Sequence, residues 1–522
     1  MAFKYTEEQL NKLDKELLIQ LFLGLQEQLE ALTAQTEALN TKMQQMMEQL
    51  ILSNKSRFGR SSEKLEDTSQ IRFMEVDGTI VFFNEAEADI SGLPRQRIDH
   101  YLSEEELTAE FGEKGWKQLP DVISNCYRFV PAKVEIEEHH IGVYSSKTDE
   151  HMVKAPHPKK LLRGSLVSES LAAAIMNGKY VNAVPLYRLE KEFERYGLAI
   201  TRQNMANWMI RLSEEYLAVM YDYLHELLYN YHVIQADETP VLVNKDGRPA
   251  GSKSWMWVYR SGFMYPERQI ILYEYQKTRN ASHPREFLKN YTGICVTDGY
   301  QVYHTLEKER EDLKIAGCWV HCRRKFDEAL TVIPKELRKQ SVLYLIMKQI
   351  QAIYREEGKL TALSSEERLK QRQLVVQPLV DAFFSYLKQN RDKAGKSSKA
   401  KEAFTYALNQ EPYLRVFLED GHVPMDNNAS ERAIRGFCGF CGFCIGKKNW
   451  EMIDTIHGAN SSAIIYSIAE TAKANNLKPY EYFEYLLTEI PKHMEDTNRD
   501  FLTELLPWAK TLPEYIRKPE EK

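Results

Sequence analysis

The chain has 522 residues, more than a single hydrophobic core usually holds together. Its residues are 43% hydrophobic and 28% charged, a composition that excludes a disordered chain. No apolar run approaches the ~20 residues of a membrane-spanning helix, the N-terminus lacks a signal-peptide core, and the seven cysteines are an odd number, so we expect a cytoplasmic protein without a membrane partner. The formal net charge of −6 does not exclude DNA binding, which depends on where the basic side chains cluster.

The first 65 residues are dominated by one long predicted helix, at 6–52. From Leu18 to Leu50 its apolar side chains recur at alternating spacings of four and three residues, with Thr36 as the polar member. Such a pattern, sustained over several heptads without proline, favours a coiled coil, so we expect a homo-oligomer joined through this helix. The alternative is a helix that packs on its own domain.

Residues 66–155 are expected to form a small module. The dipeptide Asp77-Gly78 separates two apolar runs, which predicts a β-hairpin. Cys126 is the only cysteine before Cys295, so the histidines of this region lack cysteine partners at the spacing of a zinc site. We therefore do not expect zinc in this module.

Residues 156–225 are predicted to be helical and form the expected DNA-binding region. From Lys154 to Arg211 there are ten basic residues against four glutamates. A turn at Gly197 precedes Thr201, the expected N-cap of a helix, in an order typical of a helix-turn-helix whose second helix reads base edges. An ordinary pair of amphipathic helices with a solvated face is the alternative. The side chains expected to contact DNA are Arg202, Gln203, Asn204 and Asn207.

Strand-like runs begin in the segment 226–329, the expected first part of an α/β core. Three of them predict an antiparallel meander, at 231–243, 254–260 and 269–275. A fourth strand is expected at 293–298, and a fifth apolar run near 315–320 leads into a basic helix. Asp237 and Asp298 each close an apolar run, which places both carboxylates at strand ends. Either aspartate taken alone is also an ordinary turn residue.

Helices are predicted for 330–420, which interrupts the core as an insertion. Within it, the basic stretch 388–401 either lies on phosphates or forms a solvated loop. Glu431 stands near the start of a polar helix, where the alternative role is a capping box with Asn428. The remaining segments are the region of this helix and further C-terminal helices, 421–490, and a tail, 491–522.

Two carboxylates at the ends of buried strands and a third on a distant helix suit a two-metal site for phosphoryl transfer. Magnesium prefers hard oxygen ligands and keeps several waters, so a few converging carboxylates are enough to hold it. Two ions can clamp the attacking and leaving oxygens of a phosphodiester. Metals also explain why like charges are gathered, since each unscreened pair at ~4 Å costs about 4 kcal/mol at an effective dielectric of ~20.

Further motifs accompany these acids along the chain, at 57–64 (RFGRSSEK), 318–326 (CWVHCRRKF), 427–435 (NNASERAIR), 445–450 (IGKKNW) and 461–467 (SSAIIYS). In this order they resemble the transposases of insertion sequence family sixty-six (IS66), the TnpC type, whose catalytic residues are an Asp-Asp-Glu (DDE) triad. The resemblance runs nearly end to end. It places Asp237, Asp298 and Glu431 at the triad positions, as catalytic residues and as metal ligands.

The resemblance implies a DNA transposase with a ribonuclease H-like α/β core. Such an enzyme would bind the terminal inverted repeats of its element, then cut and join them to target DNA with two Mg²⁺ or Mn²⁺ ions. It would act at the bacterial nucleoid, with accessory proteins of the same element as partners. His321 either contacts the scissile region or is structural, and Trp450 suits a core position equally well. The further side chains expected on DNA are Arg323, Arg324, Arg435, Lys447, Lys448 and Trp450.

One departure from the family pattern is a tandem repeat of Gly-Phe-Cys, three copies at 436–444 where relatives carry one. Two additional copies lengthen the segment that joins Glu431 to Lys447. A first rival interpretation is therefore a DNA-binding relic whose catalysis is impaired by the expansion. A second rival is a structural or adaptor protein in which the coiled coil is the functional part and the acids are turn residues.

Overall fold

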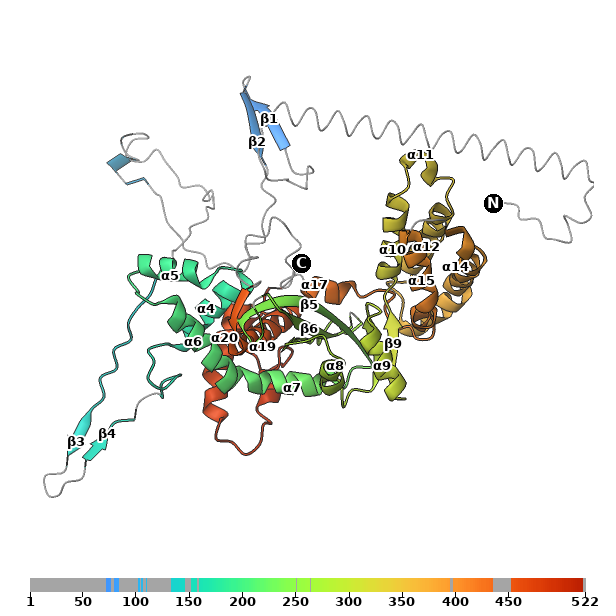
Figure 1. Cartoon of the computed structure of the whole chain (residues 1–522). Helices are drawn as coiled ribbons and strands as arrows, with labels where there is room; N and C mark the ends of the chain where they lie inside the picture. The colour runs from blue at the N-terminus through green and yellow to red at the C-terminus, as the bar shows by residue number, and fades with distance from the viewer. Residues whose placement is uncertain are drawn as a thin grey trace, which may run out of the picture. The chain divides into compact units, whose positions relative to one another are not determined.

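The computed structural model describes residues 159–249, 251–262, 264–394, 398–434 and 452–519, and shorter stretches before them that include 72–76, 79–83, 133–145 and 152–156 (Figure 1). It divides into two compact units, Met1–Pro120 and Asp121–Lys522, which we treat separately. Several predicted features lie outside the described residues: the N-terminal coiled coil, Cys126, Arg435, the Gly-Phe-Cys triplets, Lys447, Lys448 and Trp450.

In the first unit, strands β1 (Arg72–Val76) and β2 (Thr79–Phe83) pair antiparallel. Their register pairs Val76 with Thr79. The hairpin predicted around Asp77-Gly78 is therefore confirmed. A second small hairpin, in the other unit, joins β3 (Val143–Ser145) to β4 (Met152–Lys154).

A mixed sheet forms the centre of the second unit, in the order β7-β6-β5-β8-β9, with β10 also paired to β5. The first three strands are antiparallel, which confirms the predicted meander, whereas β8, β9 and β10 run parallel to the strands they join. The strands are β5 (Val233–Lys245), β6 (Lys253–Ser261), β7 (Ile271–Gln276), β8 (Gly293–Thr297), β9 (Leu313–Gly317) and β10 (Met452–Thr455).

Successive side chains of a strand face opposite sides of a sheet, and both faces of this one are buried. On β8, Ile294 and Val296 contribute to one core, while Cys295 between them contributes to the other. The first core includes the helices that precede the sheet, within 169–228, and the C-terminal helices from 456 onwards, and the second includes the helices within 319–418. The whole is an α/β architecture with helices on both sides of a mixed sheet.

Helices before the sheet have an apolar face that packs on the C-terminal helices. Thr201 accepts a hydrogen bond from the backbone N–H of Asn204 (3.2 Å), which confirms the predicted N-cap. Met205, Met209 and Leu212 are buried on the same helix. The elements are α4 (Glu169–Met176), α5 (Leu186–Arg195), α6 (Arg202–Leu212) and α7 (Ala218–Leu228), with π-helical turns at η1 (Asn177–Val181) and η2 (Ser213–Leu217).

Short helices α8 (Ser282–Phe287) and α9 (Gln301–Glu309) connect the later strands, and α10 (Trp319–Thr331) follows β9. Trp319 and Phe326 of α10 enter an aromatic cluster with Phe383 and Phe384. The helices that complete this group are α11 (Lys335–Arg338), α12 (Val342–Gly358), α13 (Ser365–Gln371), η3 (Arg372–Val376), α14 (Gln377–Gln389), η4 (Arg391–Ala394), α15 (Ser398–Asn409), α16 (Glu411–Leu414) and η5 (Val416–Leu418).

The C-terminal part returns to the sheet. Hydroxyl groups of α19 (Ile456–Ala474) bind the outer edge of β7: Ser467 accepts from the backbone N–H of Tyr273 (2.8 Å) and Thr471 from that of Ile271 (3.0 Å). Covering a sheet edge in this way removes a surface on which another strand could pair. The other elements are α17 (Asn428–Ile434), α20 (Pro479–Glu489), η6 (Ile490–His493), α21 (Leu502–Leu505) and η7 (Glu514–Ile516). None of the described helices has the length and apolar character that a membrane crossing requires.

Candidate active site

Asp237 lies inside strand β5, not at its end as predicted. The antiparallel ladder with β6 continues through it, pairing Asp237 with Val258, and holds the strand extended as far as Leu242. On the other side of β5 the neighbour changes. Strand β8 pairs only as far as Gln235, and β10 begins at Leu242. Asp237 therefore occupies the gap between two parallel neighbours.

The segment that leads into helix α17 packs against β5 beside this gap. The Asn427 side chain donates a hydrogen bond to the carbonyl oxygen of Ala236 (2.8 Å). In return, the side chain of Gln235 donates to the carbonyl of Asp426 (3.1 Å). These two bonds fix the start of α17, and with it Glu431, next to the strand that carries Asp237.

Asp298 directly follows β8, the parallel neighbour of β5, as predicted from its position after an apolar run. Its carboxylate accepts a hydrogen bond from the backbone N–H of Tyr300 (2.8 Å), and Gly299 between them has a φ of +92°. The carbonyl of Asp298 also accepts from the hydroxyl of Tyr406, on α15 (2.8 Å). Asp298 thus shapes a tight turn, and its side chain remains about one quarter exposed (23%).

Glu431 projects from α17 towards α10, the basic helix of the CWVHCRRKF motif. Its carboxylate oxygens lie 3.3 Å from Nη2 of Arg324 and 3.7 Å from Nδ1 of His321. The backbone N–H of Asn428, which a capping box would use, is instead donated to Oδ1 of Asp426 (3.0 Å). The capping alternative for Glu431 is therefore wrong.

The acids influence one another electrostatically. Burial raises the pKa of Asp237 to about 8, and the neighbouring carboxylates of Glu238, Asp298 and Glu431 add to this increase. Burial and Asp298 also raise the pKa of Glu238 to about 7, against the lowering effect of Arg279. Like charges that raise one another's pKa values in a buried position are typical of a functional site.

Glu238 and Arg279 belong to this site and were missed by the sequence analysis. Arg279 donates a hydrogen bond from Nε to the buried Glu238 carboxylate (2.8 Å) and lies 3.9 Å from Oδ2 of Asp298. Its guanidinium also lies over the rings of Tyr300, at 3.7 Å, and Trp255, at 4.8 Å. Glu238 was detectable as a second acid beside Asp237, whereas Arg279 has no sequence signal because only the fold brings it here.

We expect Arg279→Ala to lower the free energy of unfolding by about 2–4 kcal/mol, because it leaves the Glu238 carboxylate buried without its charged partner, with only the Tyr303 hydroxyl still donating to it (3.2 Å). The expected loss is slightly smaller than for a fully buried pair, because the Arg279 side chain is one-third exposed (33%) and solvent screens its charge. Urea denaturation measures the change. Arg285→Ala is the matched control, since its pair with Glu309 is exposed and contributes only about 0–1 kcal/mol. Equal losses in both variants would contradict the proposed importance of the Arg279 pair.

The three acids offer carboxylate oxygens, which is the donor type that a hard divalent cation takes. Oε1 of Glu431 is buried and has no hydrogen-bond partner among the described residues. Asp237 and Asp298 supply further carboxylate oxygens, the ligands that Mg²⁺ and Mn²⁺ prefer. Cys318 and His321 also lie near Glu431, with donor atoms all within 4.8 Å. Burial raises the pKa of the Cys318 thiol to about 12, and its sulfur accepts the backbone N–H of Asn427 (3.2 Å), so the thiol has a structural partner.

Those residues predicted to bind DNA that the structure describes fall into two groups. Arg324 forms an ion pair with Glu431 and so lies beside the acids. The guanidinium of Arg323, on the same helix, lies over the ring of Tyr354 (5.5 Å). Helix α6 instead packs against α4, α5 and α19, so its predicted residues are not brought to the acids. The side chains of these predicted residues are exposed: Arg202, Gln203, Asn204 and Asn207.

Fold and site together define an α/β protein with a cluster of buried and partly buried carboxylates where a helix meets its central sheet. Residues 164–461 match the family model described as "Transposase IS66 family", and residues 467–508 match the "IS66 C-terminal element". The first match spans more than half of the chain and contains all three acids of the expected triad. The chain belongs to the IS66 transposase family.

Three relatives from Sinorhizobium fredii are similar over most of the chain. The uncharacterized protein y4qI is 28% identical over 388 residues, which cover 73% of this chain and 69% of the relative. The uncharacterized protein y4jD is 26% identical over 436 residues, 81% and 82% of the two chains. The uncharacterized protein y4hP is 24% identical over 403 residues, 75% and 71% of the two chains.

Proposed function

We propose that this protein is a DNA transposase of the Asp-Asp-Glu class that cuts and joins DNA with divalent metal ions. The observation that carries the proposal is the placement of Asp237 in one strand and Asp298 directly after its neighbour with Glu431 on the helix beside them, where Asp298 and Glu431 both raise the pKa of Asp237. Family membership supports the same function. The strand order β7-β6-β5-β8-β9, antiparallel then parallel, agrees with a ribonuclease H-like core.

In this proposal the chain's own residues bind and orient the reacting groups. Asp237, Asp298 and Glu431 would hold the metal ions through their carboxylate oxygens. Bound ions would supply the charge that activates water or a DNA 3′-hydroxyl and stabilises the departing oxygen. Arg324 holds the Glu431 carboxylate with His321 beside it, while Glu238 positions Arg279 beside Asp298. No covalent bond between protein and DNA is needed.

The test is cleavage and strand transfer on DNA that carries the element's own ends, with Mg²⁺ or Mn²⁺, compared with DNA of scrambled ends. We expect activity that requires both the metal and the correct ends. The control protein is the triple variant Asp237→Asn, Asp298→Asn, Glu431→Gln, which should bind the ends and leave them uncut. Equal cleavage by the parent and the triple variant would reject the Asp-Asp-Glu assignment.

We also propose that helix α6 contacts the transposon ends, since its predicted DNA-binding side chains are exposed and its N-terminus is fixed by Thr201. Arg202→Ala should weaken binding to the ends by about 1–3 kcal/mol if the side chain reads a base edge. Arg195→Ala, at the end of α5, is also an exposed arginine and serves as the control. Equilibrium binding at one fixed salt concentration measures both, and equal losses would indicate a general charge effect.

A catalytically impaired relic is the second candidate, favoured by the three Gly-Phe-Cys copies at 436–444. Its prediction is specific: the parent binds the ends without cutting them, and deletion of two copies restores cleavage. The predicted N-terminal coiled coil would serve either form by joining copies of the chain at the paired ends. The element's accessory proteins remain proposed partners.

A further inference from the structure

Three metal-binding side chains meet at a second place, where strand β5 begins. His232 immediately precedes the strand, while Asp420 and His422 follow the last helical turn of the segment before α17. Nε2 of His232 lies 2.6 Å from Oδ2 of Asp420, and Nδ1 of His422 lies 2.9 Å from Oδ1. One donor atom from each residue can be chosen so that all three lie within 4.8 Å of one another.

The backbone that carries His232 is held by its neighbours in the sheet. Its carbonyl oxygen accepts hydrogen bonds from the backbone N–H of Ile294 (2.9 Å) and from the hydroxyl of Tyr291 (3.0 Å). At Gly293, a side chain would come within 2.5 Å of the same carbonyl, so the close approach requires glycine. The position of the first imidazole is thus set by the core.

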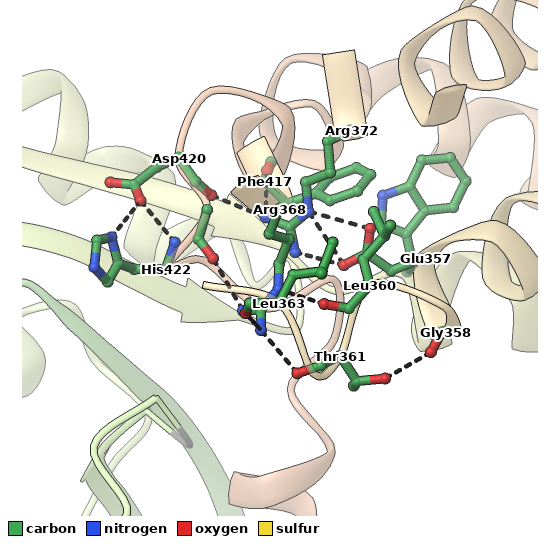
Figure 2. Close-up of polar contacts among 12 residues, drawn as sticks. Glu357, Gly358, Leu360, Thr361, Leu363, Arg368, Arg372, Phe417, Asp420 and His422 are labelled. Atoms are coloured by element: carbon green, nitrogen blue, oxygen red, sulfur yellow. Dashed lines mark hydrogen bonds and ion pairs between the residues drawn. The ribbon is translucent and has the colours of Figure 1, made fainter. Parts of the chain in front are cut away.

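Two buried arginines fix the segment that carries the other two residues (Figure 2). Arg372 donates to the carbonyl oxygens of Phe417 (2.7 Å) and Asp420 (2.9 Å), with its charge balanced by Glu357. Arg368 donates to the carbonyl of Gly421 (3.1 Å). Figure 2 shows the Asp420 carboxylate turned towards His422, whose own backbone N–H it accepts (2.8 Å). A preorganised backbone of this kind lowers the cost of bringing ligands together.

We propose that His232, Asp420 and His422 form a site for a transition-metal dication such as Zn²⁺. Two imidazoles and one carboxylate suit this class of ion, whereas Mg²⁺ prefers a shell made of oxygen atoms. The three side chains are 51%, 21% and 42% exposed, so an ion can enter and keep water as a further ligand. The two short hydrogen bonds to Asp420 would be exchanged for metal bonds.

This site is separate from the proposed catalytic cluster. His232 and Asp237 are five residues apart on an extended strand, which places them on the order of 16 Å from each other. Asp420 and His422 begin the segment that continues to Asn427 and then to Glu431. An ion bound here would cross-link that segment to the N-terminal end of β5 and would stabilise the position of the start of α17. This structural role does not depend on the proposed DNA chemistry.

Co²⁺ is the probe, because its visible absorption reports imidazole and carboxylate ligation. The parent for this experiment is the full chain with Asp237→Asn and Glu431→Gln, which removes two of the proposed catalytic ligands. It is stripped of metal with a chelator, dialysed and titrated with Co²⁺. We expect one ion per chain, displaced by Zn²⁺ and not by Mg²⁺. His232→Asn and His422→Asn should each weaken Co²⁺ binding by more than about tenfold. Zn²⁺ should raise the Tm of the parent and not of these variants.

His493→Asn is the matched control, because His493 makes the same kind of contact with Asp496 (2.8 Å) without a second imidazole in the group. Its Co²⁺ affinity should equal that of the parent. Both test positions are substantially exposed, and a Tm in the presence of chelator verifies that each variant folds. The proposal is rejected if the parent gives no Co²⁺ spectrum, or if either folded histidine variant binds as the parent does. Either outcome would leave a hydrogen-bonded His-Asp-His group.

Discussion

Glu431→Gln is expected to lower the rate of Mg²⁺-dependent cleavage of transposon ends by at least about 10³-fold while binding to those ends is retained. The substitution keeps the size of the side chain and its contacts to Arg324 and His321, but removes the charge that would hold a metal ion. The loss of a preorganised electrostatic partner at a reaction centre typically costs about 10²–10³-fold, and a displaced metal costs more. Single-turnover cleavage measures the rate, and a gel-shift titration measures binding.

The control for this substitution is Glu419→Gln, the same chemical change twelve positions earlier, at an exposed glutamate paired with Lys314. Its cleavage rate should lie within about twofold of the parent, since exposed ion pairs contribute only about 0–1 kcal/mol. Cleavage by Glu431→Gln within the same range would remove this residue from the triad. Loss of both cleavage and end binding would instead indicate that α17 supports the DNA-binding surface.

Much of the sheet could be predicted because its signals are local. Alternating apolar residues mark β5, β6 and β7, and the turn residues between them fix the meander. The N-cap at Thr201 and the hairpin at Asp77-Gly78 depend on neighbours only a few positions away. Asp298 was placed correctly at the end of β8 for the same reason: the apolar run simply stops there.

The errors and omissions arise where distant segments meet. An apolar run that ends at Asp237 suggests a strand end, but pairing with β6 extends the strand across that position. Arg279 reaches Glu238 from 41 residues away, and His232 reaches Asp420 from 188 residues away. No periodicity or spacing encodes these contacts, since they depend on how β5 is shared between β6, β8 and β10. The expected triad could be assigned from the sequence only because family motifs surround each acid.

Asp237→Asn is expected to stabilise the metal-free protein at pH 8, although it should abolish cleavage. Burial in the folded chain raises the pKa of Asp237 from the ordinary 3.8 to about 8, and the nearby carboxylates contribute to this increase. Between these values the unfolded chain is ionised while the folded chain holds a proton, so folding stability falls as pH rises from about 4 to about 8. Each tenfold change in the ionisation constant is worth about 1.4 kcal/mol, which makes the total effect several kcal/mol. Asparagine cannot ionise and avoids this loss.

Urea denaturation at pH 5 and pH 8 in the presence of chelator tests the argument, with Asp454→Asn as the control because that aspartate is exposed and pairs with Lys245. The advantage of Asp237→Asn over the parent should grow from pH 5 to pH 8, and the control should show no such trend. Adding Mg²⁺ at pH 8 should make the parent more stable than Asp237→Asn. The ion stabilises the ionised carboxylate of the parent, and the variant lacks this ligand. A parent that is the more stable protein at pH 8 without metal would show that Asp237 is held by contacts that compensate its charge, and would remove the electrostatic argument for a cation at this cluster.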